Sequence, residues 1–291
     1  MQFLSTAQLK NAMAAIPRGA ADYPAEWLDV KDAPETLYAV GDISLLHGRK
    51  FVIVGSRRTP AYALKLGAQI ASDLSDTFVI TTGTADGGDS AAIEGALRSG
   101  GRVICLLAGG FSSMPQGNLS LLQRVAENGL LLSPHEFDAT VRAFSYEYRN
   151  KLLAKLGVGV LVLGAAQKSG ALITAKHAKA FDIPLFALPY APGSSAGEGC
   201  NALLKEGAYL TENATDVLKK YGVERTQTKA AVVLSADEEK LYVALKDKAE
   251  AHVSELSSAS GVPAFKARAL LSALEVKGLV VALGGNCYKA L

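Results

Sequence analysis

Short apolar runs, each followed by a loop rich in glycine and serine and then by a helical stretch, recur through the middle of the chain. The first run is FVIV at 51–54, and it ends at Gly55 ahead of Ser56 and two arginines. Apolar runs without alternation, such as VGVLVLG at 158–164, are typical of strands that are covered on both faces of a sheet. Strands that alternate with helices in this way predict a doubly wound, mostly parallel α/β sheet with right-handed crossovers.

The pattern places this sheet between residue 46 and about residue 222. In a doubly wound sheet the glycine loops gather at the carboxyl ends of the strands, where ligands bind. Glycine lets a backbone come close to a ligand and helix N-termini offer N–H groups to anions, so we expect a phosphate-bearing ligand. The predicted strands lie near 51–55, 78–82, 102–107, 129–133, 158–164, 183–188 and 208–211, and the predicted helices near 61–74, 90–99, 119–127, 146–156, 172–181 and 214–221.

The two ends of the chain differ from this repeated pattern. Residues 1–45 are predicted to form a lead that begins with a helix in LSTAQLKNAMAAI and packs on the core at 46–222. Residues 223–231 are polar and are predicted to be a linker. Residues 232–291 predict three helices followed by a hairpin around 284–286, which is the order of a small winged-helix domain.

Composition indicates a soluble, cytoplasmic protein without a bound metal or cofactor. The 291 residues are 49% hydrophobic, and no apolar run approaches the roughly 18 residues that a membrane helix needs. The four histidines and three cysteines are scattered, so neither a zinc site nor a disulfide framework is indicated. The formal net charge is only +2, so nucleic acid would have to bind a local patch of positive charge.

Four polar residues stand in the loops of the first half of the predicted sheet. Arg57 and Arg58 directly follow the first strand, where two guanidiniums beside a tight glycine turn favour anion binding. Asp89 and Asn118 each come directly before a predicted helix, where they are expected to be N-caps. A carboxylate in a phosphate cleft would repel its ligand, so Asp89 is not expected to be catalytic.

The second half of the predicted sheet adds further candidates for the same cleft. Lys168 and Ser169 open the loop after the fifth strand, and the first turn of the next helix is expected to point at the cleft. Arg149 and Lys151 flank Asn150 on the helix before that strand. We expect one of these two cations to face the cleft.

Six motifs occur in an order that resembles the DNA-processing protein A family, also called DprA or Smf. They are GSRRT, TGTADGGDSAAIEGAL, MPQGN, FSYEYRNK, SGALITA and GEGCN followed by EGA, within about residues 23 to 221. The resemblance implies an extended Rossmann-like domain that binds single-stranded DNA and forms dimers. It also implies delivery of the recombinase RecA onto incoming strands during natural transformation, with the tail as the family's optional winged helix.

The resemblance also implies roles for particular residues. It assigns contacts with DNA to Gly55, Ser56 and Arg57, to Lys151 as the basic residue of an RNR-like motif, and to Ser169, Gly170 and Thr174. No residue is predicted to be catalytic. The full predicted DNA site consists of Gly55, Ser56, Arg57, Arg58, Asn118, Arg149, Asn150, Lys151, Lys168, Ser169, Gly170 and Thr174.

The chain departs from the family pattern in places, and two other functions stay open. GGDSAAI stands where the family usually has GID-x-x-AH, so Ile93 replaces a histidine. One alternative is a nucleotide-binding or nucleotide-hydrolysing enzyme of the same superfamily, although LLAGGFSSM lacks the P-G-G-x-G-T-x-x-E motif of such enzymes. The other is a nucleotide-sensing transcriptional regulator. The tail counts against a regulator, because residues 229–291 hold eight Lys or Arg against seven Asp or Glu, whereas readers of duplex DNA are strongly basic.

Overall fold

Residues 6–223, 234–248 and 250–290 are described by the computed structural model of the chain. The chain divides into two units, Met1–Glu224 and Arg225–Leu291, and each has its own hydrophobic core. Almost all of the predicted linker at 223–231 lies outside the described residues.

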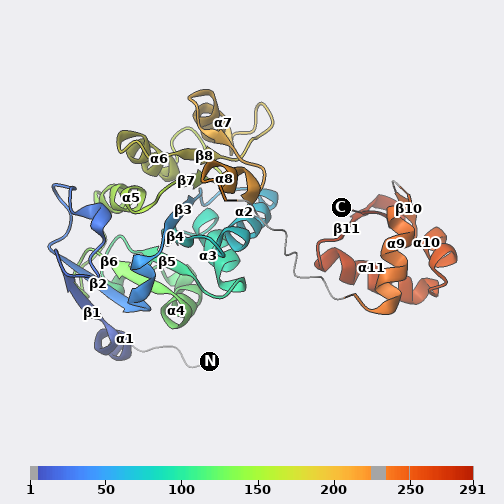
Figure 1. Cartoon of the computed structure of the whole chain (residues 1–291), viewed down its shortest axis with the longest axis horizontal. Coiled ribbons are helices and arrows are strands. Elements are labelled where there is room, and N and C mark those ends of the chain that lie inside the picture. The colour runs from blue at the N-terminus through green and yellow to red at the C-terminus, as the bar shows by residue number, and fades with distance from the viewer. Residues whose placement is uncertain (1–5, 224–233, 249, 291) are drawn as a thin grey trace. The chain divides into compact units, whose positions relative to one another are not determined.

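A nine-stranded sheet forms the centre of the first unit, in the order β1-β2-β6-β5-β4-β3-β7-β8-β9 (Figure 1). All pairings from β6 to β9 along this order are parallel, and the two pairings that involve β2 are antiparallel. The predicted α/β class with a mostly parallel sheet is therefore confirmed. The strands are β1 (Ala14–Pro17), β2 (Thr36–Gly41), β3 (Lys50–Val54), β4 (Val79–Thr82), β5 (Val103–Leu106), β6 (Leu130–Ser133), β7 (Val160–Val162), β8 (Leu185–Ala187) and β9 (Tyr209–Leu210).

The strand order reverses beside β3, and this reversal puts helices on both faces of the sheet. From β3 the chain steps outward to β6 with α2, α3 and α4 on one face, and it then returns to β7 with α5 and α6 on the other (Figure 1). Every residue of β3, β4, β5 and β6 is buried, as expected for strands covered on both sides. The helices are α2 (Ala61–Leu74), α3 (Gly88–Arg98), α4 (Leu119–Asn128), α5 (Ser145–Leu156), α6 (Gly170–Ala180), α7 (Glu198–Lys205) and α8 (Ala214–Lys220).

The N-terminal segment adds two strands to the same sheet. The helix α1 (Thr6–Ala12) is shorter than predicted, and the chain continues as β1, whose backbone pairs with β2. The longer predicted helix is wrong because this pairing satisfies the backbone groups of Ala14–Pro17 and buries Ile16. Trp27 is fully buried, and its Nε1 donates to the Leu152 carbonyl at 2.9 Å, which holds the segment against α5.

The described residues of the second unit form three helices and a small sheet. Ser235 caps the first helix, since its hydroxyl accepts from the Glu238 N–H while the Glu238 carboxylate accepts from the Ser235 N–H at 2.7 Å. Gly261, with φ at 71°, ends the second helix, as its left-handed backbone allows. The elements are α9 (Ala236–Lys246), α10 (Val253–Ser260), α11 (Ala264–Val276), β10 (Ala251–His252), β11 (Val280–Leu283) and β12 (Cys287–Ala290).

Candidate functional site

The loops that follow β3 and β7 lie side by side, at the point where the strand order reverses. The Ser56 N–H donates to the Gly164 carbonyl at 2.8 Å, which ties the first loop to the second. Gly55 also packs against Gly88 at the start of α3, because a Cβ atom on Gly55 would lie 2.8 Å from the Gly88 Cα. Only glycine fits in such a close approach of two backbones, so these glycines serve packing as well as access for a ligand.

These loops border a cavity of about 360 Å³, which we call the glycine-loop cavity. Residues of α5 and the beginning of α6, together with Ala85 and, at the start of α3, Asp89, complete its lining. It lies at the crevice where doubly wound sheets bind their ligands. The predicted site residues that line it are Gly55, Ser56, Arg57, Arg58, Arg149, Asn150, Ser169, Gly170 and Thr174.

Arg57 and Arg58 supply the exposed positive charge of the glycine-loop cavity. Both side chains are exposed, and neither guanidinium has a hydrogen-bond or ion-pair partner among the described residues. The turn that carries them is bonded internally. The Arg58 N–H donates to the Ser56 Oγ at 3.0 Å, and the Thr59 hydroxyl donates to the Ser56 carbonyl at 2.8 Å. The two guanidiniums are therefore presented by a fixed turn, with their donors available to an anion.

Arg149 is a buried cation of the same cavity and is only 5% exposed. Its Nη1 donates to the Leu106 carbonyl at 2.8 Å, and its Nε donates to the side-chain oxygen of Asn150 at 2.9 Å. Burial lowers the pKa of the Arg149 guanidinium, and the nearby Asp89 carboxylate opposes that shift. Arg149 therefore joins α5 to the end of β5 and balances a buried negative charge.

Asp89 is not the helix N-cap that the sequence predicts. The helix α3 begins at Gly88, so Asp89 lies inside its first turn. The Asp89 carboxylate instead accepts hydrogen bonds from the Gly55 N–H at 3.3 Å and from the Ala85 N–H at 3.2 Å. Burial raises the pKa of this carboxyl, while the charge of Arg149 lowers it. The prediction is wrong because the amides of two glycine loops, brought together by the fold, are the partners of this carboxylate.

The first turn of α6 gives the cavity a second source of positive charge. Ser169 is the N-cap, and its Oγ accepts from the Ala171 N–H at 3.3 Å. The Asn150 side-chain amide donates to the Gly170 carbonyl at 3.2 Å and so fixes α5 to this turn. The first N–H groups of an α-helix carry partial positive charge, which favours an anion at this end.

Three of the predicted site residues lie outside the lining of the glycine-loop cavity. Asn118 is at the N-cap position of α4, but its side chain is buried and donates to the Thr84 carbonyl at 3.1 Å. Lys151 lies on another face of α5 and pairs with Asp32. Lys168 is exposed on the loop that leads into α6.

Tyr146 lines the cavity and is absent from the predicted site. It lies on α5, three residues before Arg149, and it is 43% exposed. Its spacing of three residues from Arg149, which puts both on one face of a helix, was the only signal in the sequence. An aromatic residue at such a position is more often part of a core. Its exposure in the folded chain makes the ring available for stacking.

The described residues set limits on other kinds of site. No helix among them is long and apolar enough to cross a membrane. They also contain no group of three or more His, Cys, Asp or Glu side chains placed to hold a metal ion.

Comparison with known proteins identifies relatives of the first unit. Residues 14–222 match the family model described as DNA recombination-mediator protein A. The DNA processing protein DprA of Streptococcus pneumoniae is 32% identical over 200 residues, which are 68% of this chain and 71% of that protein. The DNA processing protein DprA of Bacillus subtilis is 31% identical over 214 residues, which are 72% of each chain.

Solved structures of two such proteins have the same fold. The X-ray structure of DprA from Streptococcus pneumoniae superposes with a TM-score of 0.69 at 30% identity, over 74% of this chain and 78% of the other. The structure of DprA from Helicobacter pylori, described for its single-stranded DNA binding mode, gives a TM-score of 0.66 at 31% identity, over 72% of this chain and 95% of the other.

Proposed function

The chain belongs to the DNA recombination-mediator protein A family, and from that premise we propose that it binds single-stranded DNA through the glycine-loop cavity. One observation carries the proposal: the free guanidiniums of Arg57 and Arg58 and the first turn of α6 converge on one cavity. The cations and backbone amides hold phosphates, and the exposed Tyr146 ring stacks on a base. Since neither kind of contact reads base edges, binding has little sequence preference.

Membership of this family also bears on the enzyme alternative. The family and the relatives are named for recombination and DNA processing, and the prediction that the chain is not an enzyme is confirmed by that membership. Ile93, which stands in place of the histidine that the family pattern leads one to expect, is fully buried in α3. The position therefore offers no titratable group to the cavity.

The proposal extends to the role of the whole chain in recombination. A cytoplasmic homodimer would hold the strand and deliver the RecA recombinase onto it, in keeping with the description of the family as a recombination mediator. We take the second unit to be a winged helix, with α10, the turn at Gly261 and α11 as its helix-turn-helix and β11 and β12 as its wing. Its nearly balanced charge favours a protein partner over duplex DNA.

The test is a titration of fluorescent oligonucleotides with the full chain at several salt concentrations. We expect single strands to bind more tightly than duplex or free nucleotides. The logarithm of the affinity should fall against the logarithm of salt by about 0.7 per phosphate contacted. Binding that prefers duplex, or that does not respond to salt, would contradict the proposal.

A second measurement asks which unit holds the DNA. A chain that ends near residue 225 retains the first unit and its core, and we expect it to keep most of the affinity for single strands. A loss of more than about 2 kcal/mol, roughly thirtyfold in dissociation constant, would place a main DNA contact on the second unit and revive the regulator alternative.

A further inference from the structure

A second and larger cavity lies on the other side of α5, and the proposed function does not use it. This cavity of about 900 Å³ is called here the histidine cavity, after His135 and His177 in its lining. Residues three and four apart on a helix share a face, and α5 exposes one such face to each cavity. Tyr146, Arg149, Asn150 and Leu153 line the glycine-loop cavity, whereas Phe144, Glu147, Tyr148 and Lys151 line the histidine cavity.

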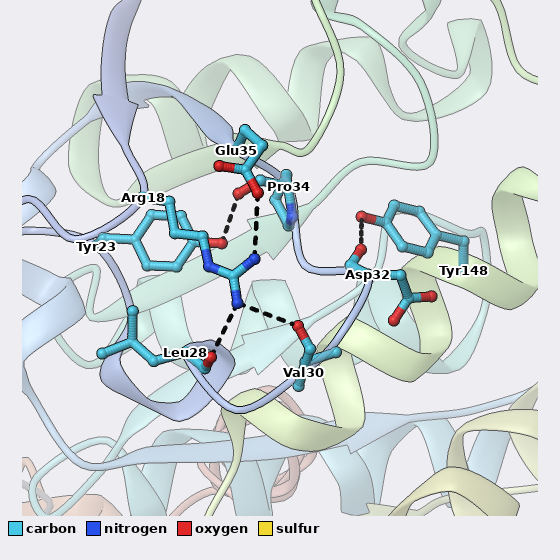
Figure 2. A network of polar contacts seen from close by, with 8 residues as sticks. All are labelled: Arg18, Tyr23, Leu28, Val30, Asp32, Pro34, Glu35 and Tyr148. Carbon is cyan, nitrogen blue, oxygen red and sulfur yellow. Dashed lines mark hydrogen bonds and ion pairs between the residues drawn. The ribbon is translucent and has the colours of Figure 1, made fainter.

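One wall of the histidine cavity is formed by the N-terminal segment at 32–36, which is held in place by polar contacts (Figure 2). The Arg18 guanidinium donates to the Leu28 carbonyl at 2.9 Å, within the loop that leads to this wall. The Tyr148 hydroxyl, from α5, donates to the Asp32 carbonyl at 2.7 Å. The wall therefore keeps its shape before any ligand arrives, which reduces the free energy lost on ordering when a ligand binds.

The two histidines leave hydrogen-bonding capacity in the lining that the folded chain does not use. The Nε2 atoms of His135 and His177 are buried and have no hydrogen-bond partner among the described residues. An unpaired polar atom of this kind costs free energy until a partner reaches it. Burial lowers the pKa of both imidazoles, so they are neutral at pH 7 and add no positive charge to the cavity.

The charged groups of the histidine cavity are mainly acidic. Lys151 is its only Lys or Arg side chain in the described lining, and it pairs with Asp32. Glu35 pairs with Arg18 at 3.2 Å. Glu136 and Glu147 are exposed and have no ion-pair partner among the described residues. A ligand that enters this cavity therefore meets two free carboxylates.

We propose that the histidine cavity binds an arginine side chain of a partner protein, held by Glu136 and Glu147 and stacked on Phe144. A guanidinium has five N–H donors and no acceptor, which complements the two free carboxylates. Phe144 is 62% exposed at the N-cap of α5, and a guanidinium stacks well on such an aromatic face. The same acidic lining repels a phosphate backbone, so the strand held in the glycine-loop cavity does not extend into this one.

The experiment uses the full chain and a fluorescein-labelled pentapeptide in which two arginines alternate with glycines. A second peptide carries citrulline in place of arginine, which keeps the shape and removes the charge. Fluorescence anisotropy should show binding of the arginine peptide and about tenfold or weaker binding of the citrulline peptide, because a charge-assisted contact is lost. Equal binding of the two peptides would overturn the proposal.

Variants then place the peptide on the molecule. The double variant Glu136→Gln/Glu147→Gln should bind the arginine peptide about tenfold more weakly or worse, and Phe144→Ala should also weaken it. All three side chains are exposed, so these changes leave the core intact. Glu127→Gln, at an exposed acid of α4 outside both cavities, is the matched control and should bind as the parent does.

Binding of an oligonucleotide by the same variants separates the two possible occupants of the cavity. We expect the double glutamine variant to bind single-stranded DNA as tightly as the parent chain. If the variant lost affinity for the oligonucleotide and kept its affinity for the peptide, the histidine cavity would be a nucleic-acid site and the proposal would be wrong. Unchanged peptide binding in both variants would overturn it equally.

Discussion

The two cavities on either side of α5 share one helix and carry opposite charge. The glycine-loop cavity presents the free guanidiniums of Arg57 and Arg58, and the histidine cavity presents the free carboxylates of Glu136 and Glu147. The helix presents one face to each cavity. The rotation of the helix about its own axis therefore decides which ligand each of its side chains can meet. A basic residue on α5 is therefore informative about DNA only once its face is known.

The cavities also differ in how their buried polar groups are balanced. In the glycine-loop cavity Arg149 and Asp89 have opposite charges, so each favours the ionised form of the other. Both groups also make hydrogen bonds to the backbone. In the histidine cavity the buried groups are neutral imidazoles with an unpaired nitrogen. Because the buried charges of Arg149 and Asp89 balance each other, loss of either side chain should lower the stability of the fold. Because the buried histidines are desolvated, stability should depend on pH through their protonation.

The largest effect is expected from Arg149→Ala. Removal of this guanidinium leaves the Asp89 carboxylate buried without its neighbouring cation, which should lower the free energy of unfolding by about 3 kcal/mol or more. Urea denaturation followed by circular dichroism measures the change. Arg57→Ala, at an exposed position, should alter stability by about 0.5 kcal/mol or less. Equal stability of the two variants would show that the buried and exposed arginines do not differ in role.

Affinity for DNA should distinguish the two exposed arginines, Arg57 and Arg58. Arg57→Ala should weaken binding of a fluorescent single strand by roughly 1.5–3 kcal/mol, or about tenfold or more, because one charge-assisted contact is lost. Arg58→Ala should weaken it less, since the charge of Arg57, unlike that of Arg58, acts on Asp89 inside the cavity. Affinity of Arg57→Ala equal to that of the parent chain would remove Arg57 from the site.

The sequence predicted the central strands and helices because their apolar runs and loops are local signals. The same signals are weak in the N-terminal segment, where β1 and β2 exist only through pairing with each other and with β6. Tyr209 and Leu210 form the edge strand β9, which was predicted from a short apolar stretch. The helix α7 was not predicted, because its residues directly follow a run of glycine and serine that indicates a loop.

The site was predictable where the residues stand in a loop that follows a strand and less so on helices. Arg57 and Ser169 follow strand ends, and the topology alone brings them together. Arg149 and Lys151 are two positions apart on α5, so they point about 200° apart around the helix. Only the packing of α5 decides which of them faces the glycine-loop cavity. The histidine cavity draws on segments far apart in the chain, so no local pattern could indicate it.

The neutral histidines predict a loss of stability in mildly acidic solution. Burial is the main cause that lowers the pKa of His135 and of His177, although the charge of Glu147 opposes the shift for His177. In the unfolded chain both titrate near 6.5. As the pH falls below that value, the unfolded chain binds protons first, so the free energy of unfolding decreases until the pH has passed the folded pKa values.

Thermal unfolding between pH 7.5 and about pH 5 tests this expectation against a variant that cannot titrate. The midpoint of the parent chain should fall across this range more steeply than that of His135→Gln/His177→Gln. The paired carboxylates Asp29 and Asp32, whose pKa values are lowered by hydrogen bonds from lysines, act in a separate window below about pH 4. Parallel curves for the parent and the variant would contradict the assignment of neutral, buried imidazoles.

The smallest effect is expected from Lys151→Ala, and it bears most directly on the difference between the two faces of α5. The family resemblance assigns this residue to DNA, yet its side chain pairs with Asp32 in the histidine cavity. Exposed ion pairs contribute little, so stability should change by less than about 1 kcal/mol. If the face of the helix determines the partner, affinity for single strands should stay within about twofold of the parent chain, a difference of roughly 0.4 kcal/mol. The same titration that measures Arg57→Ala gives this comparison at matched salt. A loss as large as that of Arg57→Ala would mean that the strand crosses α5 and reaches the second cavity, and the separation of a DNA face from a protein-binding face would then fail.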